Sequence, residues 1–187
     1  MRAKRCGVWL VLGFLLFLTA PTPTPRPSLF TPTATDTSVP ALARTWPVGT
    51  RPAVLRGWEP PATVYGRGHR GVDLAAPAGT PVRAVAAGRV SFAGRVAGKG
   101  VVAVELTGTD LRTTYEPVTA SVKKGDEVEA GEVVGTVEPT GSHCTTTCVH
   151  WGLLRADTYL DPLSLLPPWL LRRGPSRLLP VLDVPLP

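Results

Sequence analysis

Residues 122–135 read Val-Lys-Lys-Gly-Asp-Glu-Val-Glu-Ala-Gly-Glu-Val-Val-Gly. Gly125 follows two lysines, Gly131 follows Glu-Ala, and each precedes a short stretch that carries valine. The pattern predicts a turn, a short strand, a second turn and a second strand. This rhythm is typical of a compact all-β module built from hairpins.

The same pattern continues on both sides of this stretch. Short apolar runs recur between about residue 64 and residue 165, and Gly, Pro or Asp separates most of them. The runs are 82–85, 90–93, 101–106, 111–115, 133–137 and 149–154. No segment repeats apolar residues with the 3.6-residue period of a long amphipathic helix. We therefore expect an all-β domain with a small, mostly antiparallel sheet or sandwich.

Composition agrees with this fold class and excludes one class of partner. Gly (19) and Pro (21) together exceed a fifth of the 187 residues, whereas aromatic residues make up 6%, which suits a turn-rich β protein. The formal net charge is +6, but residues 66–166 hold 10 Lys or Arg against 11 Asp or Glu. The folded part therefore lacks the basic footprint of a nucleic-acid-binding domain, and we expect no nucleic-acid partner.

The first 20 residues have the composition of a secretory signal. Three cations (Arg2, Lys4 and Arg5) precede an apolar run from Cys6 to Ala20. Such a run of about fifteen residues fits a signal peptide and is short for a membrane-spanning helix, which needs about twenty. Pro21 disfavours cleavage after Ala20, so an uncleaved N-terminal membrane anchor remains an alternative. Both interpretations place the rest of the chain outside the cytoplasmic membrane, either secreted or membrane-anchored.

The remainder of the chain divides into three parts by composition. Residues 21–40 hold six Pro and six Thr and cannot build a core, so they predict an extended spacer. Together with a mixed stretch that we expect to pack on the domain, they form a Pro/Thr-rich linker and lead-in over residues 21–61. The folded domain is expected over residues 62–166, and a Pro/Leu-rich tail over residues 167–187.

Two cysteines follow the N-terminal segment, Cys144 and Cys148. In an oxidising compartment a pair of cysteines favours a disulfide. Because they are four residues apart, a disulfide needs a tight loop that brings their Cβ atoms together. Two reduced thiols remain the alternative.

The chain has only three histidines, His69, His143 and His150. His69 lies four residues before Asp73, and His150 lies within an apolar run that predicts a strand. Two imidazoles and one carboxylate are suitable zinc ligands, and they leave a fourth coordination position open for water. By spacing alone, an isolated His and Asp pair also arises by chance, and a histidine on a strand is often only hydrogen-bonded.

The order of these motifs resembles the M23 peptidases, the lysostaphin or LytM-like zinc endopeptidases that cut peptidoglycan cross-bridges. Residues 68–75, Gly-His-Arg-Gly-Val-Asp-Leu-Ala, are similar to the family's H-x-G-x-D-[LI] motif. Residues 76–90 and 122–135 resemble its next two segments. Residues 149–153, Val-His-Trp-Gly-Leu, resemble the end of its H-x-H-[FW]-[GE] motif. The resemblance covers about residues 65–165.

The resemblance implies a LytM-type fold, also called a duplicated hybrid motif, with one Zn²⁺ site. It implies that His69, Asp73 and His150 are the zinc ligands. It also implies a location at the cell wall, and peptide cross-links of peptidoglycan as the substrate.

Two positions depart from the family pattern. Active members carry a histidine in a Y-x-H segment, where this chain has Pro117, and a first histidine in H-x-H, where it has Cys148. By the resemblance, those two histidines flank the zinc-bound water and act in the transition state. Their loss costs several powers of ten in rate unless other groups replace them.

Three outcomes stay open. In the first, the protein is a zinc metallopeptidase of weak or altered activity, with His143 or Glu116 as the catalytic group; for His143 the alternative is a solvated loop residue. In the second, a Cys148 thiolate is a fourth zinc ligand, which closes the site and excludes the disulfide. In the third, the domain binds peptidoglycan or regulates a wall-hydrolase partner without cutting.

Overall fold

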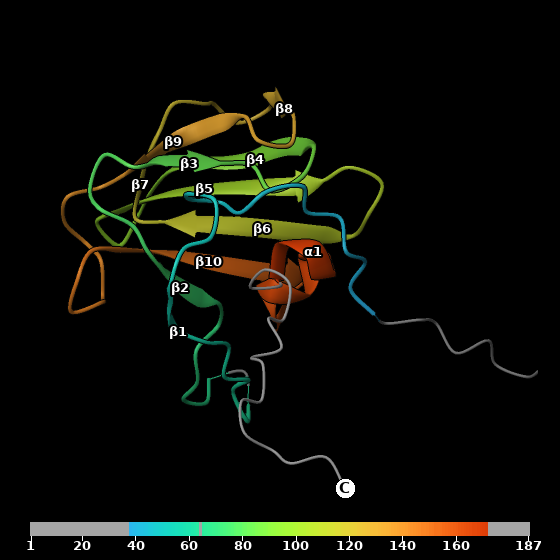
Figure 1. Cartoon of the computed structure of the whole chain (residues 1–187), viewed down its shortest axis with the longest axis horizontal. Coiled ribbons are helices and arrows are strands. Elements are labelled where there is room, and N and C mark those ends of the chain that lie inside the picture. Colours follow the sequence, from blue (N-terminus) through green and yellow to red (C-terminus); the bar gives the residue numbers. More distant parts are fainter. Residues whose placement is uncertain (1–37, 64, 172–187) are drawn as a thin grey trace, which may run out of the picture. The chain divides into compact units, whose positions relative to one another are not determined.

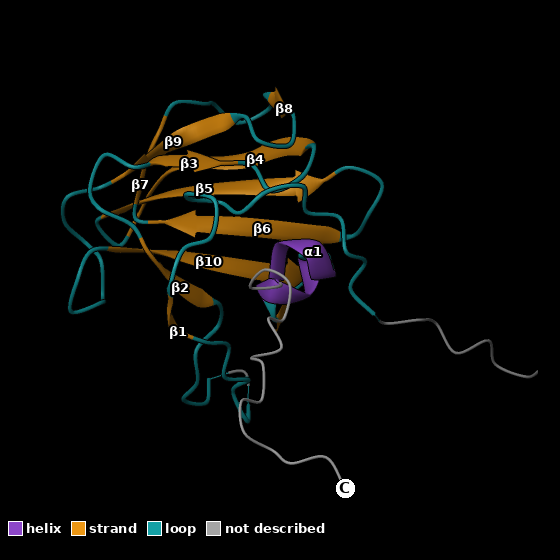
Figure 2. Ribbon diagram, in the orientation of Figure 1, coloured by secondary structure: helices purple, strands orange, loops and turns teal. Residues whose placement is uncertain are grey.

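The computed structural model describes residues 38–63 and 65–171. These residues form one compact unit, which is almost entirely β structure (Figures 1 and 2). The predicted signal or anchor, residues 1–20, and most of the predicted spacer and tail lie outside the described residues. Within the described part of the chain, no helix is long and apolar enough to cross a membrane.

Two antiparallel sheets carry the fold. The larger has eight strands, in the order β1-β2-β10-β6-β5-β4-β8, with β11 paired to β10; the smaller has the order β3-β9-β7. The strands of the larger sheet are β1 (Val54–Arg56), β2 (Val72–Ala75), β4 (Gly88–Val96), β5 (Lys99–Leu106), β6 (Leu111–Glu116), β8 (Glu127–Val128), β10 (Cys148–Arg155) and β11 (Thr158–Leu160). Those of the smaller are β3 (Pro81–Arg83), β7 (Val118–Ala120) and β9 (Val133–Val137). A 3₁₀ turn, η1 (Pro162–Leu165), and a one-turn helix, α1 (Pro168–Leu171), follow the strands.

The predicted all-β, mostly antiparallel fold is confirmed. Strand β6 shows how alternation builds it: Leu111, Thr113 and Tyr115 are buried, while the residues between them are partly exposed. Alternate side chains of a strand point to opposite faces of a sheet, so one face of β6 enters the core. The other face carries Glu116, which lies opposite His150 of the neighbouring strand β10.

The folded unit begins earlier than the boundary at residue 62 that we expected. Ala43, Trp46 and Val48 are buried in the core, and Ala43 N–H donates to the carbonyl of Leu165. Strand β1 also joins the edge of the larger sheet. The physical reason is that these few apolar side chains are buried in the core, although their spacing has no strand or helix period.

Candidate metal centre

Two adjacent antiparallel strands place the first two residues of the centre. Strands β2 and β10 pair so that Asp73 lies directly opposite His150. Side chains opposite each other on neighbouring strands lie on the same face about 5 Å apart at Cβ. The Asp73 side chain is buried and that of His150 is nearly so.

His69 reaches the same point from the segment before β2. Its backbone pairs with Glu59 through two hydrogen bonds, of 3.1 and 2.8 Å. Its ring Nδ1 lies 2.6 Å from the carbonyl oxygen of Gly57. Because a carbonyl oxygen can only accept, Nδ1 carries the hydrogen, and in the neutral ring Nε2 keeps its lone pair. A backbone partner on one ring nitrogen that aims the other is the usual support of a metal-binding histidine.

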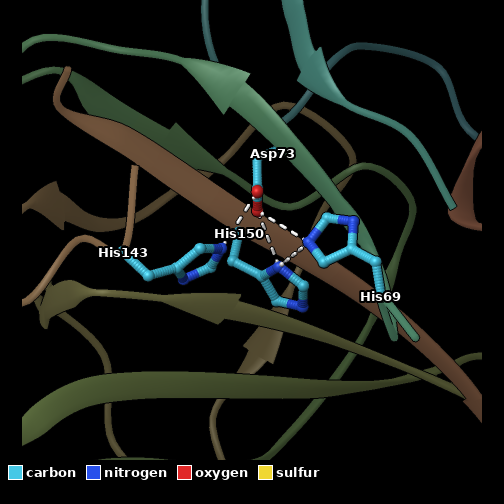
Figure 3. Close-up of side chains that lie close together, drawn as sticks. All are labelled: His69, Asp73, His143 and His150. Carbon is cyan, nitrogen blue, oxygen red and sulfur yellow. Dashed lines mark hydrogen bonds and ion pairs between the residues drawn. The ribbon is translucent and has the colours of Figure 1, made fainter. Parts of the chain in front are cut away.

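Three possible ligand atoms converge on one point (Figure 3). His69 Nε2 lies 3.1 Å from Asp73 Oδ1, and His150 Nδ1 lies 2.8 Å from the same oxygen. The two ring nitrogens are 3.2 Å apart. In a tetrahedral zinc site with bonds of 2.0–2.1 Å, ligand atoms are separated by about 3.3 Å. The spacing and the chemistry of these three atoms therefore fit zinc.

His143 completes a group of four residues. Its Nε2 lies 2.9 Å from the second carboxylate oxygen of Asp73, and 39% of its side chain is exposed. All four residues offer a ligand atom within 4.8 Å of one another. His143 is thus an exposed loop residue whose ring is also hydrogen-bonded to the central carboxylate.

A short disulfide-closed loop presents His143. Cys144 and Cys148 are joined by a disulfide. Ser142 Oγ accepts hydrogen bonds from the backbone N–H groups of both cysteines, at 3.2 and 3.3 Å. The loop is thus tied at both ends, and His143 lies between Ser142 and the bridge.

The same disulfide corrects one prediction about ligands. A sulfur in a disulfide is not a thiolate, so Cys148 does not provide the fourth ligand in this structure. Glu116 lies opposite His150 in the β6–β10 pair, but its carboxylate is 3.4 Å from Lys99 Nζ and it is not one of the four clustered residues. The structure therefore brings His143 into the centre and places Glu116 beside it.

Asp73 is held in its ionised form. Burial favours the neutral acid, but the hydrogen bonds from His150 and His143, together with the attraction of His143 and His69, outweigh it, so the pKa of Asp73 lies below its ordinary value. A carboxyl pKa that is lower in the folded state contributes stability above the usual carboxyl range. That contribution is lost as the pH falls through the lower, folded-state pKa.

Gly71 allows the backbone to pass close beside the centre. A Cβ atom there would lie 2.4 Å from the carbonyl oxygen of Trp151 and 2.6 Å from His150 Nε2. We expect Gly71→Ala to lower the free energy of unfolding by about 1–3 kcal/mol, as overpacked sites do, and to displace the His150 ring.

The matched control is Gly57→Ala, because a Cβ at Gly57 meets no atom within 4 Å. Urea unfolding of both variants measures the difference. Equal urea midpoints for the two variants would show that the close approach at Gly71 does not affect the free energy of unfolding.

Comparison with known proteins identifies the class to which this fold and site belong. The sequence model of peptidase family M23 matches residues 67–162, about half of the chain. The chain therefore belongs to peptidase family M23, a family of zinc-dependent peptidases.

Particular relatives agree. An uncharacterized protein of Mycobacterium tuberculosis is 40% identical over 141 residues, which are 73% of this chain and 54% of that protein. The chain thus spans about half the length of this relative.

Solved structures are similar as well. A zinc-containing peptidase from Vibrio cholerae has a TM-score of 0.55 and 27% identity, over 68% of this chain and 41% of that one. The catalytic domain of lysostaphin from Staphylococcus simulans has a TM-score of 0.53 and 26% identity, over 65% of this chain and 93% of that one.

Proposed function

We propose that this chain is a zinc metallopeptidase that acts on peptide cross-links of peptidoglycan, outside the cytoplasmic membrane. His69, Asp73 and His150 are its zinc ligands, and His143 is its catalytic histidine. Family membership and the similarity to lysostaphin's catalytic domain support the substrate class. The observation that carries the proposal is the convergence of His143 on the same carboxylate as the other two histidines.

Each of these residues has a distinct task. A bound zinc ion supplies a Lewis acid and lowers the pKa of a coordinated water toward neutrality. Asp73 uses one oxygen toward this centre and the other toward His143. His143, with its ring partly exposed, accepts a proton from the attacking water and returns it to the leaving amine.

The Gly57 carbonyl fixes the His69 ring, and the disulfide loop fixes the position of His143. His69 is aimed by its hydrogen bond to Gly57, and His143 is presented by the loop that Cys144 and Cys148 close. Catalytic groups held in place before the substrate arrives lose less entropy in the transition state. With one histidine in place of the family's two, we expect turnover to be slower than in members that keep both.

A non-catalytic peptidoglycan-binding or hydrolase-regulating domain is the second candidate. The residues at the two positions that differ from the family pattern favour this candidate. Pro117 offers no titratable group, and Cys148 is part of the disulfide.

Native mass spectrometry of the purified protein, without reductant, tests the first part of the proposal. We expect one zinc ion and the loss of two hydrogens from the disulfide. Release of soluble peptides from purified peptidoglycan, abolished by a chelator and restored by zinc, tests the second part. Zinc binding without release would favour the non-catalytic candidate, and a folded protein without zinc would overturn both the metal and the peptidase proposals.

A further inference from the structure

A cleft of about 290 Å³ opens beside the metal centre. Asp73 and His143 line it where it meets the centre. The disulfide loop contributes Cys144, Thr145 and Thr146, and strand β1 contributes Leu55 and Arg56. Because the cleft includes two of the four clustered residues, a peptide bound there lies against the proposed reaction site.

Arg56 gives this cleft its positive charge. It lies opposite Asp73 in the β1–β2 pair, at the edge of the larger sheet (Figure 1). Among the described residues that line the cleft, it is the only lysine or arginine. A planar guanidinium presents two parallel N–H donors, which match the two oxygens of a carboxylate.

Arg56 is paired with Glu59, which a carboxylate of a bound peptide can replace. Arg56 Nε and Nη2 lie 3.2 and 2.7 Å from the two carboxylate oxygens of Glu59. Their side chains are 46% and 55% exposed, and exposed ion pairs contribute little to stability because water competes for both partners. A carboxylate on a bound peptide could therefore take the place of Glu59 at small cost.

Glu59 also connects the Arg56–Glu59 pair to the segment that carries His69. Its backbone forms the two hydrogen bonds that bracket His69. The Arg56–Glu59 pair therefore lies next to the segment that aims His69, which places a carboxylate bound by Arg56 near the centre.

We propose that Arg56 binds a carboxylate of the peptide substrate and selects peptides with a free carboxylate near the scissile bond over uncharged ones. This inference rests on the proposed function, because it takes the cleft as the substrate cleft. It narrows the substrate class to acidic peptides, such as those that keep the carboxylate of a glutamyl residue, and disfavours bridges built only from neutral residues.

Two fluorescein-labelled pentapeptides test the proposal. They share one sequence with a central glutamyl residue, whose carboxylate is free in one peptide and converted to the carboxamide in the other. Fluorescence anisotropy with the full chain gives Kd for each peptide, with and without zinc, and hydrolysis gives kcat and KM. We expect the free carboxylate to bind about tenfold more tightly, as hydrogen bonds to charged groups allow.

Three variants separate recognition from structural support. Arg56→Gln is expected to remove the tenfold preference. Arg56→Lys is expected to keep only part of it, because an ammonium lacks the two parallel N–H donors of a guanidinium. Glu59→Gln is expected to increase the preference, because it frees Arg56 from its competitor. If the pair only braced the His69 segment, Arg56→Gln and Glu59→Gln would weaken binding of both peptides alike.

The matched control is Arg89→Gln. Arg89 is also exposed and paired with a glutamate, Glu127 at 3.7 Å, but it lies on β4 toward the opposite edge of the sheet. We expect the Arg89→Gln variant to prefer the carboxylate peptide as strongly as the native protein does. The zinc-free measurement matters because a carboxylate that binds the metal directly would lose its preference without zinc, whereas one held by Arg56 would keep it.

The outcomes distinguish this inference from the proposed function. Equal Kd for the two peptides, or a preference that survives Arg56→Gln, overturns the role of Arg56 even if both peptides are cleaved. An Arg56-dependent preference in binding without any hydrolysis supports the carboxylate site and overturns the peptidase proposal.

Discussion

Replacing His143 by alanine is expected to lower kcat for peptide hydrolysis by about 10²–10⁴-fold, the usual contribution of a positioned general acid or base. His143 Nε2 donates to Asp73 Oδ2 at 2.9 Å, which leaves Nδ1 to take up the proton, and the ionised carboxylate stabilises the imidazolium that results. KM should change little, because the interaction is made in the transition state.

Three measurements show which role His143 has. A catalytic role predicts one bound zinc ion in His143→Ala and loss of the rise of kcat/KM with pH that a general base produces. His143→Gln keeps a hydrogen bond to Asp73 but cannot carry the proton, so it should be nearly as slow. Loss of zinc with the activity would make His143 a fourth ligand instead, and unchanged kcat would return it to a structural loop residue.

Replacing Asp73 by alanine is expected to weaken zinc binding by well over a hundredfold, more than the 10–100-fold typical of losing a supporting residue around a metal. Asp73 is the residue that all three histidines contact. Its removal takes away the only negative charge among the four clustered residues. Activity should then fall to the level measured with chelator.

Competition with a chromophoric chelator measures this change in zinc affinity. Asp73→Asn keeps the size of the side chain and separates the charge from the packing, and it should also bind zinc poorly. Asp110→Asn is the control, because Asp110 is exposed and pairs with Arg155 away from the centre. If Asp73→Ala bound zinc as tightly as the native protein, the proposed ligand set would be wrong.

The fold was predictable because it depends on local patterns. Short apolar runs broken by glycine give strands, as in β9, whose first residues end the 122–135 stretch. The spacing of His69 and Asp73, and the position of His150 in an apolar run, only allowed a metal site, and the resemblance to the M23 peptidases singled out these three residues, which the structure brings together.

Other features depend on contacts that leave no pattern in the sequence. The place of His143 is set by Ser142 and by a disulfide, and neither has a period that would predict where a loop side chain points. The same holds for Trp46, which is buried and donates through its indole N–H to the carbonyl of Leu170, 124 residues away. The sequence left Cys148 open between a zinc ligand and a disulfide, because the choice between thiolate and disulfide depends on loop geometry.

The pairing of β2 with β10 has a consequence for how the chain folds. Asp73 and His150 are 77 residues apart in sequence and meet only when these strands align. A shift by a single residue would turn one of the two side chains to the other face of the sheet. A zinc ion held at this point would therefore favour one alignment over its neighbours. It would add about 2.7 kcal/mol of stability when free zinc exceeds its Kd a hundredfold, so metal supply and correct strand alignment would be thermodynamically linked.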